Sequence, residues 1–415
     1  MLQQALNSLI TKQISEGRQI GVQVCVYYKG KRLLSNSYGK IGNNINDPIV
    51  DNGTLFLSFS VTKGIVAILL HQLVENKFLD YDTPISHYWP KFGHHNKEKI
   101  TIKQILSHQA GLYRMPTNCK VDQYFDENFM LKYIEESSPT YEPGTSVGYS
   151  PILYGWIIIG LLRKLTDTCK DLNDLIDDYI IKPFSLQGDL FIGLPYNENV
   201  INRLAKINIK VPVPEKNLEM YLASPPEFWT QFNSNEIKYL PLLSMNGYFT
   251  ARALAKIYGI LANGGRDGDR QVISLSCIEN LQKCQTIKND IVIGMPARKS
   301  MGMQLGPSSV FGDNLDTFGH CGIGGSAAFA DMNRCLGIAV LVNKMNFDYK
   351  NDPVAEICNL IRLHIDSNCC VCLKCINGDT GHDYVNDCIC NRCISRGKVI
   401  QRLKMRHSCP SLSSQ

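Results

Sequence analysis

The chain has 415 residues, of which 44% are hydrophobic and 20% are charged, and its formal net charge is +5. This composition is typical of a globular protein with one large or two moderate domains. No basic stripe is interleaved with aromatic residues, which argues against a nucleic acid partner. The longest apolar run, "ILYGWIIIGLL" (152–162), is shorter than the roughly 20 residues that cross a bilayer, so it predicts a buried helix and no membrane span. The first residues lack the pattern of a signal peptide, and we expect a cytoplasmic protein.

Strand patterns occur near both ends of the chain, and helical patterns lie between them. Residues 2–15 carry apolar side chains at helical spacing, and "GVQVCVYYKGKRLLSNSYGK" (21–40) predicts a hairpin that turns at Lys29-Gly30. From 60 to about 310 the pattern is mainly helical. Strands return from about 315, and "DPVAEICNLIRLHI" predicts a last helix.

This order predicts an α+β fold. We expect one antiparallel sheet built from both ends of the chain, flanked by the terminal helices, with a mostly helical domain inserted at about 60–310. The predicted main domain covers 1–366, and residues 367–415 form a separate Cys-rich appendage. A cleft between the sheet and the helical insert is where a ligand site is expected. Nothing in the sequence indicates an oligomeric state.

Two serine motifs compete for a catalytic role. "GTSVG" (144–148) matches G-x-S-x-G and would make Ser146 a nucleophile, but that motif needs a buried strand before it and a helix after it. The residues upstream, "SSPTYEP", are polar and interrupted by proline. "SRGK" (395–398) has S-x-x-K spacing without a helical pattern and is interpreted as a coincidence.

"SVTK" (60–63) has a better context, because it stands at the start of a predicted helix. Residues three apart share a helix face, so Ser60 and Lys63 point the same way. The positive end of the helix dipole favours a developing anion there, and a lysine in a dry cleft can act as a base. The alternative is a serine that caps the helix, followed by a solvated lysine.

Further stretches follow "SVTK" in order: "LSHQAGL" (106–112), "EPGTSVGYS" (142–150), "MNGYFTARALAKIYGILANGG" (245–265) and "FGHCGIGGSAAFADM" (318–332). Together they resemble the serine β-lactamase and penicillin-binding-protein superfamily. The similarity is to its class C β-lactamase-related branch, which includes carboxylesterases and D-aminopeptidases, and it covers residues 1–366. Within "LSHQAGL" we interpret His108 and Gly111 as structural, with Gly111 ending a short helix.

The resemblance implies roles for single residues. Ser60 matches the family's acylated nucleophile and Lys63 its partner base. Tyr149 matches the tyrosine that relays the proton, and His320 matches the first position of the Lys/His-x-Gly strand motif that lines the cleft. The backbone N–H groups of Ser60 and Ile323 would form the oxyanion hole.

The same resemblance implies that Gly322, Gly324 and Gly325 allow close approach of substrate. One position departs from the family pattern, because Pro151 stands where members that hydrolyse β-lactams commonly have an amide. We therefore expect a serine hydrolase of a small-molecule ester or amide that needs no cofactor for catalysis, with β-lactam hydrolysis left open. The competing hypothesis is a catalytically degenerate binding module of the same fold.

The appendage holds two C-x2-C pairs at nearly zinc-ribbon spacing. The predicted ligands are Cys372, Cys375, Cys390 and Cys393. A segment with few apolar residues cannot make its own core, so a structural zinc ion would supply folding energy. The alternative is a thiol-rich tail without metal, and the family resemblance does not cover this segment.

Overall fold

The computed structural model describes residues 2–165, 171–207, 217–232, 237–348 and 350–369. The predicted zinc ligands at 372–393 therefore lie outside the described residues. No helix in the described ranges is long and apolar enough to cross a membrane.

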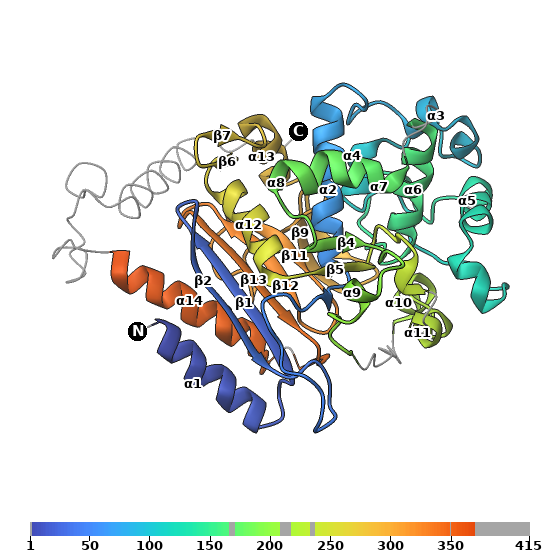
Figure 1. The fold of residues 1–415 in the computed structure, drawn as a ribbon. Coiled ribbons are helices and arrows are strands. Elements are labelled where there is room, and N and C mark those ends of the chain that lie inside the picture. Colours follow the sequence, from blue (N-terminus) through green and yellow to red (C-terminus); the bar gives the residue numbers. More distant parts are fainter. Residues whose placement is uncertain (1, 166–170, 208–216, 233–236, 349, 370–415) are drawn as a thin grey trace, which may run out of the picture.

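A large antiparallel sheet runs through the molecule (Figure 1). Among the described residues it has eight strands, in the order β2-β1-β13-β12-β11-β10-β9-β8. Its strands are β1 (Gly21–Tyr28), β2 (Lys31–Gly39), β8 (Thr286–Asp290), β9 (Met295–Lys299), β10 (Gln304–Leu305), β11 (Thr317–Cys321), β12 (Ala327–Asp331) and β13 (Leu336–Val342). The shorter strands β3 (Phe56–Leu57), β4 (Leu190–Ile192) and β5 (Gly247–Phe249) form a second sheet, and β6 (Arg266–Asp267) pairs with β7 (Arg270–Gln271).

Helices cover both faces of the large sheet. The α-helices are α1 (Leu2–Ser15), α2 (Val61–Glu75), α3 (Ile85–Tyr88), α4 (Ile102–Leu106), α5 (Glu127–Glu136), α6 (Leu153–Leu165), α7 (Leu172–Ile176), α8 (Lys182–Phe184), α9 (Glu198–Ile201), α10 (Leu218–Ala223), α11 (Pro226–Phe232), α12 (Ala251–Ala262), α13 (Leu275–Gln282) and α14 (Pro353–Cys369). Helices α1 and α14 lie on one face of the large sheet, and α12, α2 and the remaining helices lie on the other side.

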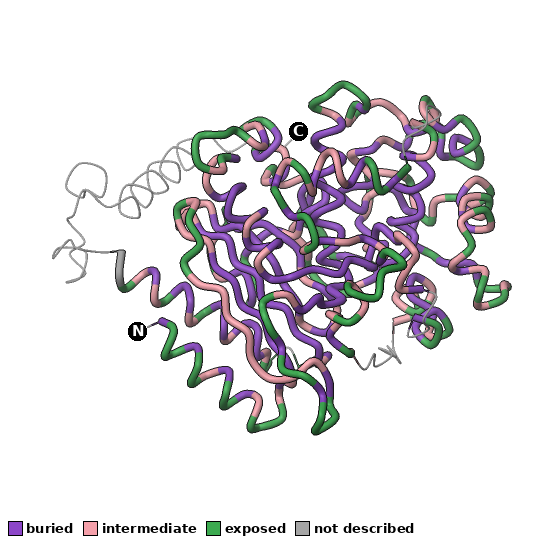
Figure 2. The backbone as a smooth tube through the Cα atoms, viewed as in Figure 1, coloured by how far each residue is buried: buried purple, intermediate pink, exposed green. Residues whose placement is uncertain are grey.

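The central strands of the large sheet are buried almost throughout (Figure 2), and their side chains belong to two separate core clusters. In β1, Val22, Val24 and Val26 face a core that α1 and α14 close. Cys25 faces the opposite core, which the helical part of the chain fills. This period-two pattern is what a sheet covered on both faces requires. On the helical side, Gly259 of α12 lies where a Cβ atom would come within 2.4 Å of the Cβ atom of Tyr27, so the helix backbone sits close on the strands.

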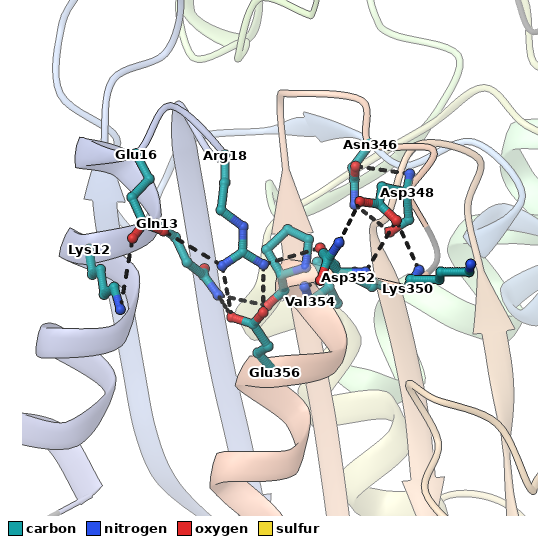
Figure 3. Close-up of polar contacts among 12 residues, drawn as sticks. Lys12, Gln13, Glu16, Arg18, Asn346, Asp348, Lys350, Asp352, Val354 and Glu356 are labelled. Carbon is teal, nitrogen blue, oxygen red and sulfur yellow. Dashed lines mark hydrogen bonds and ion pairs between the residues drawn. The ribbon is translucent and has the colours of Figure 1, made fainter.

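Polar contacts join α1 and the turn that follows it to the first turn of α14 (Figure 3). The guanidinium of Arg18 donates two hydrogen bonds to the carboxylate of Glu356, with N···O distances of 2.5 and 3.1 Å. Gln13 also donates to this carboxylate, at 2.9 Å. The bidentate geometry fixes the relative position of the terminal helices.

The predicted α+β fold, with a sheet built from both chain ends, is confirmed. The predicted hairpin is also present, and both turn residues, Lys29 and Gly30, have positive φ angles as a tight hairpin requires. Residues 286–305, which the sequence pattern assigns to the end of the helical insert, form β8 to β10 of the large sheet. The strand pattern is weak there because the middle three residues of β8 are exposed.

The predicted helix stop at Gly111 is wrong. Helix α4 ends at Leu106, where the hydroxyl of Ser107 donates to the carbonyl of Lys103. His108 then takes the left-handed conformation, with a φ of 58°. The chain therefore turns three residues earlier than the glycine suggests.

Candidate active site

Ser60 lies at the start of α2, a helix that is buried on all sides from Val61 to Leu73. The residue before it, Phe59, has a φ of 45°, which a non-glycine residue rarely adopts. The ring of Phe59 packs between Trp229 and Phe232, with centroid distances of 6.0 Å to each. This aromatic packing holds the unusual turn that delivers Ser60 to the end of the helix, and such strain is typical of functional sites.

The side chain of Ser60 does not cap the helix. It makes no capping hydrogen bond, and its hydroxyl contacts the side chains of Lys63 and Tyr149 instead. The Oγ atom lies 3.2 Å from Lys63 Nζ and 2.9 Å from the hydroxyl of Tyr149. The structure therefore brings the three predicted residues together and contradicts the alternative of a simple helix cap.

Lys63 is buried, with 1% of its surface exposed. Besides Ser60, its Nζ atom contacts the carbonyl oxygens of Pro151 and Ser244, each at 2.8 Å. Both carbonyls can only accept, and a neutral amine has two N–H donors and one lone pair. The two donors are thus used by the carbonyls, and the lone pair is left for the hydroxyl of Ser60.

The surroundings favour that neutral form. Burial, and then the charge of Lys299, hold the pKa of Lys63 well below its ordinary value. No sequence motif predicts this arrangement, because Pro151 contributes its backbone carbonyl rather than its side chain. Pro151, which departs from the family pattern, is therefore one of the hydrogen-bond acceptors of Lys63.

Tyr149 is held by its backbone and by its ring. Its N–H donates to Oδ1 of Asp290 at 3.0 Å, and its ring lies 4.8 Å from that of His108, centroid to centroid. His108 in turn accepts the N–H of Ser150 on Nδ1, at 3.2 Å. Burial raises the pKa of the Tyr149 hydroxyl above its ordinary value, so the tyrosine is a neutral phenol that acts through hydrogen bonds.

Two charged residues beside Tyr149 have no counterpart among the sequence predictions. Lys299 of β9 and Asp290 of β8 are 4% and 0% exposed and form an ion pair with an N···O distance of 2.7 Å. The Nζ atom of Lys299 lies 4.5 Å from the centroid of the Tyr149 ring. Neither residue belongs to a short motif, and the register of β8 with β9 pairs Lys299 with Thr286 and Asp290 with Met295, so the side-chain contact appears only in the folded structure.

His320 lies on β11, with its ring 6.4 Å from that of Tyr149, centroid to centroid. Its Nδ1 atom is 2.8 Å from the carbonyl oxygen of Cys321, so Nδ1 carries the proton and Nε2 is left as an acceptor. Burial lowers the pKa of His320 to about 3. His320 is therefore neutral near pH 7.

The predicted oxyanion donors lie just after β11 and at the start of α2. A Cβ atom on Gly322 would come within 2.4 Å of the carbonyl oxygen of Ser58, so only glycine fits there. Among the described residues, no acceptor contacts the N–H groups of Ser60 and Ile323. At Gly324, with a φ of 90°, a Cβ atom would meet Met345 at 2.8 Å. Both glycines are thus required for packing, and their contact with substrate stays a prediction.

Ser146 lies in a bend, with neither a strand before it nor a helix after it, so the nucleophile elbow that G-x-S-x-G requires is absent at this point of the described chain. In the described ranges, no group of three or more His, Cys, Asp or Glu side chains is placed to hold a metal ion. The site described above is built from the chain's own acid–base groups.

Known proteins resemble this chain in sequence and in structure. It is 28% identical over 310 residues to the esterase/beta-lactamase LipL of Mycobacterium tuberculosis. This alignment covers 69% of this chain and 68% of the relative. It is 23% identical over 235 residues to esterase EstB of Burkholderia gladioli, covering 51% of this chain and 59% of the relative.

Among solved structures, a family VIII carboxylesterase matches with a TM-score of 0.78 and 27% identity. A penicillin-binding protein homologue from Caulobacter crescentus matches with a TM-score of 0.79 and 26% identity. Each match covers 86% of this chain and 96% of the other. The Beta-lactamase family itself matches residues 6–357. The chain therefore belongs to the beta-lactamase family, as the ordered motifs around Ser60, Tyr149 and His320 predict.

Proposed function

We propose that this protein is a serine hydrolase that cleaves a small-molecule ester or amide through an acyl-enzyme on Ser60. The observation that carries the proposal is the hydrogen-bonding of Lys63. Two carbonyl oxygens lie 2.8 Å from Nζ and accept its N–H groups, and Ser60 Oγ lies 3.2 Å from the same atom. In the neutral amine the lone pair is then the group left to take the proton of Ser60. This is how a general base must contact a serine nucleophile.

The proposed reaction has two halves. The Ser60 oxygen attacks the substrate carbonyl while its proton passes to Lys63, and the carbonyl electron pair moves to an oxyanion held by the N–H groups of Ser60 and Ile323. Collapse of this intermediate expels the alkoxide or amine, which receives the proton from Lys63 through the hydroxyl of Tyr149. Water then attacks the acyl-enzyme by the same proton path in reverse, which releases the acid and restores Ser60.

The site favours a neutral ester over a β-lactam. Pro151 cannot offer a side-chain amide to the substrate, and its carbonyl is already used by Lys63. His320 is neutral, so it supplies no fixed positive charge for the carboxylate that β-lactams carry. Both relatives named above carry esterase in their names, one of them as esterase/beta-lactamase, which supports an ester as a substrate.

The binding-module alternative lacks support, because the contacts among Ser60, Lys63 and Tyr149 are intact. A cytoplasmic location remains part of the proposal. It is supported by free thiols at six scattered positions: Cys25, Cys119, Cys277, Cys284, Cys321 and Cys358. Scattered free cysteines suit a reducing compartment.

Hydrolysis of p-nitrophenyl acetate by the full chain tests the proposal. The wild type should turn over the ester, and Ser60→Ala should lower kcat to the background rate. Ser146→Ala, which changes the competing motif serine, is the matched control and should retain wild-type activity. Unchanged hydrolysis by Ser60→Ala would show that the nucleophile lies elsewhere.

A further inference from the structure

The ion pair between Lys299 and Asp290 stands at the base of Tyr149, and the proposed reaction does not use either residue. Asp290 is fully buried. Its Oδ1 atom accepts the backbone N–H groups of Tyr149, Val292 and Ile293 at 3.0 to 3.1 Å. Its Oδ2 atom faces Lys299. Asp290 thus holds the loop that carries Tyr149 with one carboxylate oxygen and contacts Lys299 with the other.

Two lysines thus flank one tyrosine ring in a buried site. Lys63 Nζ lies 5.2 Å from the centroid of the Tyr149 ring, and Lys299 Nζ lies 4.5 Å from it. Of the two lysines, only Lys299 has a carboxylate partner within the described part of the chain, whereas Lys63 contacts carbonyl and hydroxyl oxygens. Burial lowers the pKa of Lys299 as well, but the charge of Asp290 opposes that shift. Two protonated lysines this close repel each other strongly at low dielectric, so the proton is retained on Lys299, which has the counter-ion.

The other titratable groups around Lys63 do not supply a competing negative charge. They are Tyr149 and Tyr154, whose pKa values burial raises, and His108 and His320, whose pKa values burial lowers. All four groups are neutral near pH 7. The charge that lowers the pKa of Lys63, in addition to burial, is therefore that of Lys299.

We propose that Lys299, held by Asp290, is a positioning residue that fixes Tyr149 over Ser60 and keeps Lys63 as the neutral amine that accepts the serine proton. This inference rests on the proposed function. Asp290 accepts the backbone N–H of Tyr149 and Lys299 lies over the face of its ring, while the hydroxyl of Tyr149 donates to Ser60 Oγ at 2.9 Å. The positive charge of Lys299 then disfavours protonation of the neutral Lys63 amine.

The test is the pH dependence of kcat/KM for p-nitrophenyl acetate. Removing only Lys299 would leave a buried unpaired carboxylate, which is strongly destabilising, whereas replacing both partners of a buried pair is often tolerated. The informative variant is therefore Asp290→Asn with Lys299→Met. The introduced asparagine removes the negative charge but keeps an amide oxygen that can accept the three backbone N–H groups. A second version, Asp290→Asn with Lys299→Gln, replaces the ion pair by two amides.

Activity should rise with pH as Lys63 loses its proton. This rise of kcat/KM with pH is the acid limb of the profile. In either double variant its midpoint should move up by about one pH unit, because a nearby like charge no longer opposes protonation of Lys63. Lys299→Arg keeps the charge and should leave the limb near its wild-type position. A matched control is Asp47→Asn with Lys206→Met, which removes an ion pair outside the site and should not shift the limb.

The outcomes separate the two proposals. A double variant that loses activity equally at every pH, with its acid limb unmoved, would overturn the role of Lys299 and leave the proposed function standing. Lys299→Arg behaving like the double variants would also overturn it, because charge would then be irrelevant. A wild type that neither hydrolyses the ester nor reacts at Ser60 would instead refute the proposed function.

Discussion

Substituting alanine for Gly322 should disable the site without touching an acid–base group. Gly322 lies where β11 meets the turn before α2, and an added Cβ atom would be 2.4 Å from the carbonyl oxygen of Ser58. Real Cβ atoms essentially never come closer than 3.0 Å to such an atom. The strand end and the turn must therefore separate by at least about 0.6 Å, the difference between these two distances.

That displacement changes the spacing of the two proposed oxyanion donors, Ser60 N–H and Ile323 N–H. Losing one such donor costs roughly 10²- to 10³-fold in kcat, and a misplacement of about 1 Å can cost about 10²-fold. For Gly322→Ala we expect kcat to fall roughly 10²-fold, which is about 2.7 kcal/mol of lost transition-state stabilisation. KM should change little, because the donors act on the developing oxyanion.

The assay is steady-state hydrolysis of p-nitrophenyl acetate, with far-UV circular dichroism to confirm that the variant is folded. Gly53→Ala is the matched control, because its Cβ atom would meet its nearest neighbour, Asp51, at an ordinary 3.5 Å. This control should keep wild-type kcat. A folded Gly322→Ala protein with kcat within about twofold of the wild type would show that the oxyanion is not held at this junction.

Other predictions follow from the same site and its surroundings. His320→Ala should weaken turnover while Ser60 still reacts covalently, and complete loss of labelling would assign it a larger role. Nitrocefin should be a much poorer substrate than p-nitrophenyl acetate, and a comparable kcat/KM would refute the preference for esters. His71 is buried, and burial lowers its pKa from 6.5 to about 4. Between these two pH values the unfolded chain is protonated at His71 and the folded chain is not. Stability should therefore be complete above pH 6.5 and fall toward pH 4, by about 2 kcal/mol at pH 5. Urea unfolding of His71→Gln should lack this part of the pH dependence. The segment 367–415 should bind zinc, and elemental analysis that finds none, with freely titratable thiols, would contradict the ribbon hypothesis.

The sequence predicts the parts of the site that lie close together in the chain. Ser60 and Lys63 are three residues apart on one helix, so their contact follows from helical geometry. The hairpin at Lys29-Gly30 follows from local turn chemistry in the same way. Tyr149 and His320 were located by family resemblance, because nothing in their own neighbourhoods shows that they meet Ser60.

Other features of the site could not be predicted, because they depend on tertiary contacts. Lys299 and Asp290 are nine residues apart on two paired strands, and an isolated lysine in a sequence is normally exposed. The carbonyls of Pro151 and Ser244 carry no side-chain signal at all, yet they orient Lys63. His108 was interpreted as structural, and the structure shows that it supports the Tyr149 loop.

Covalent labelling of Ser60 tests the central proposal most directly. The full-length wild type should be incubated with a fluorophosphonate and its mass measured before and after proteolysis, with Ser60→Ala and Ser146→Ala treated alongside. We expect one adduct on the peptide that contains Ser60, the same adduct in Ser146→Ala, and none in Ser60→Ala. An adduct that persists in Ser60→Ala, or an unlabelled wild type that still hydrolyses the ester, would contradict a mechanism through this serine.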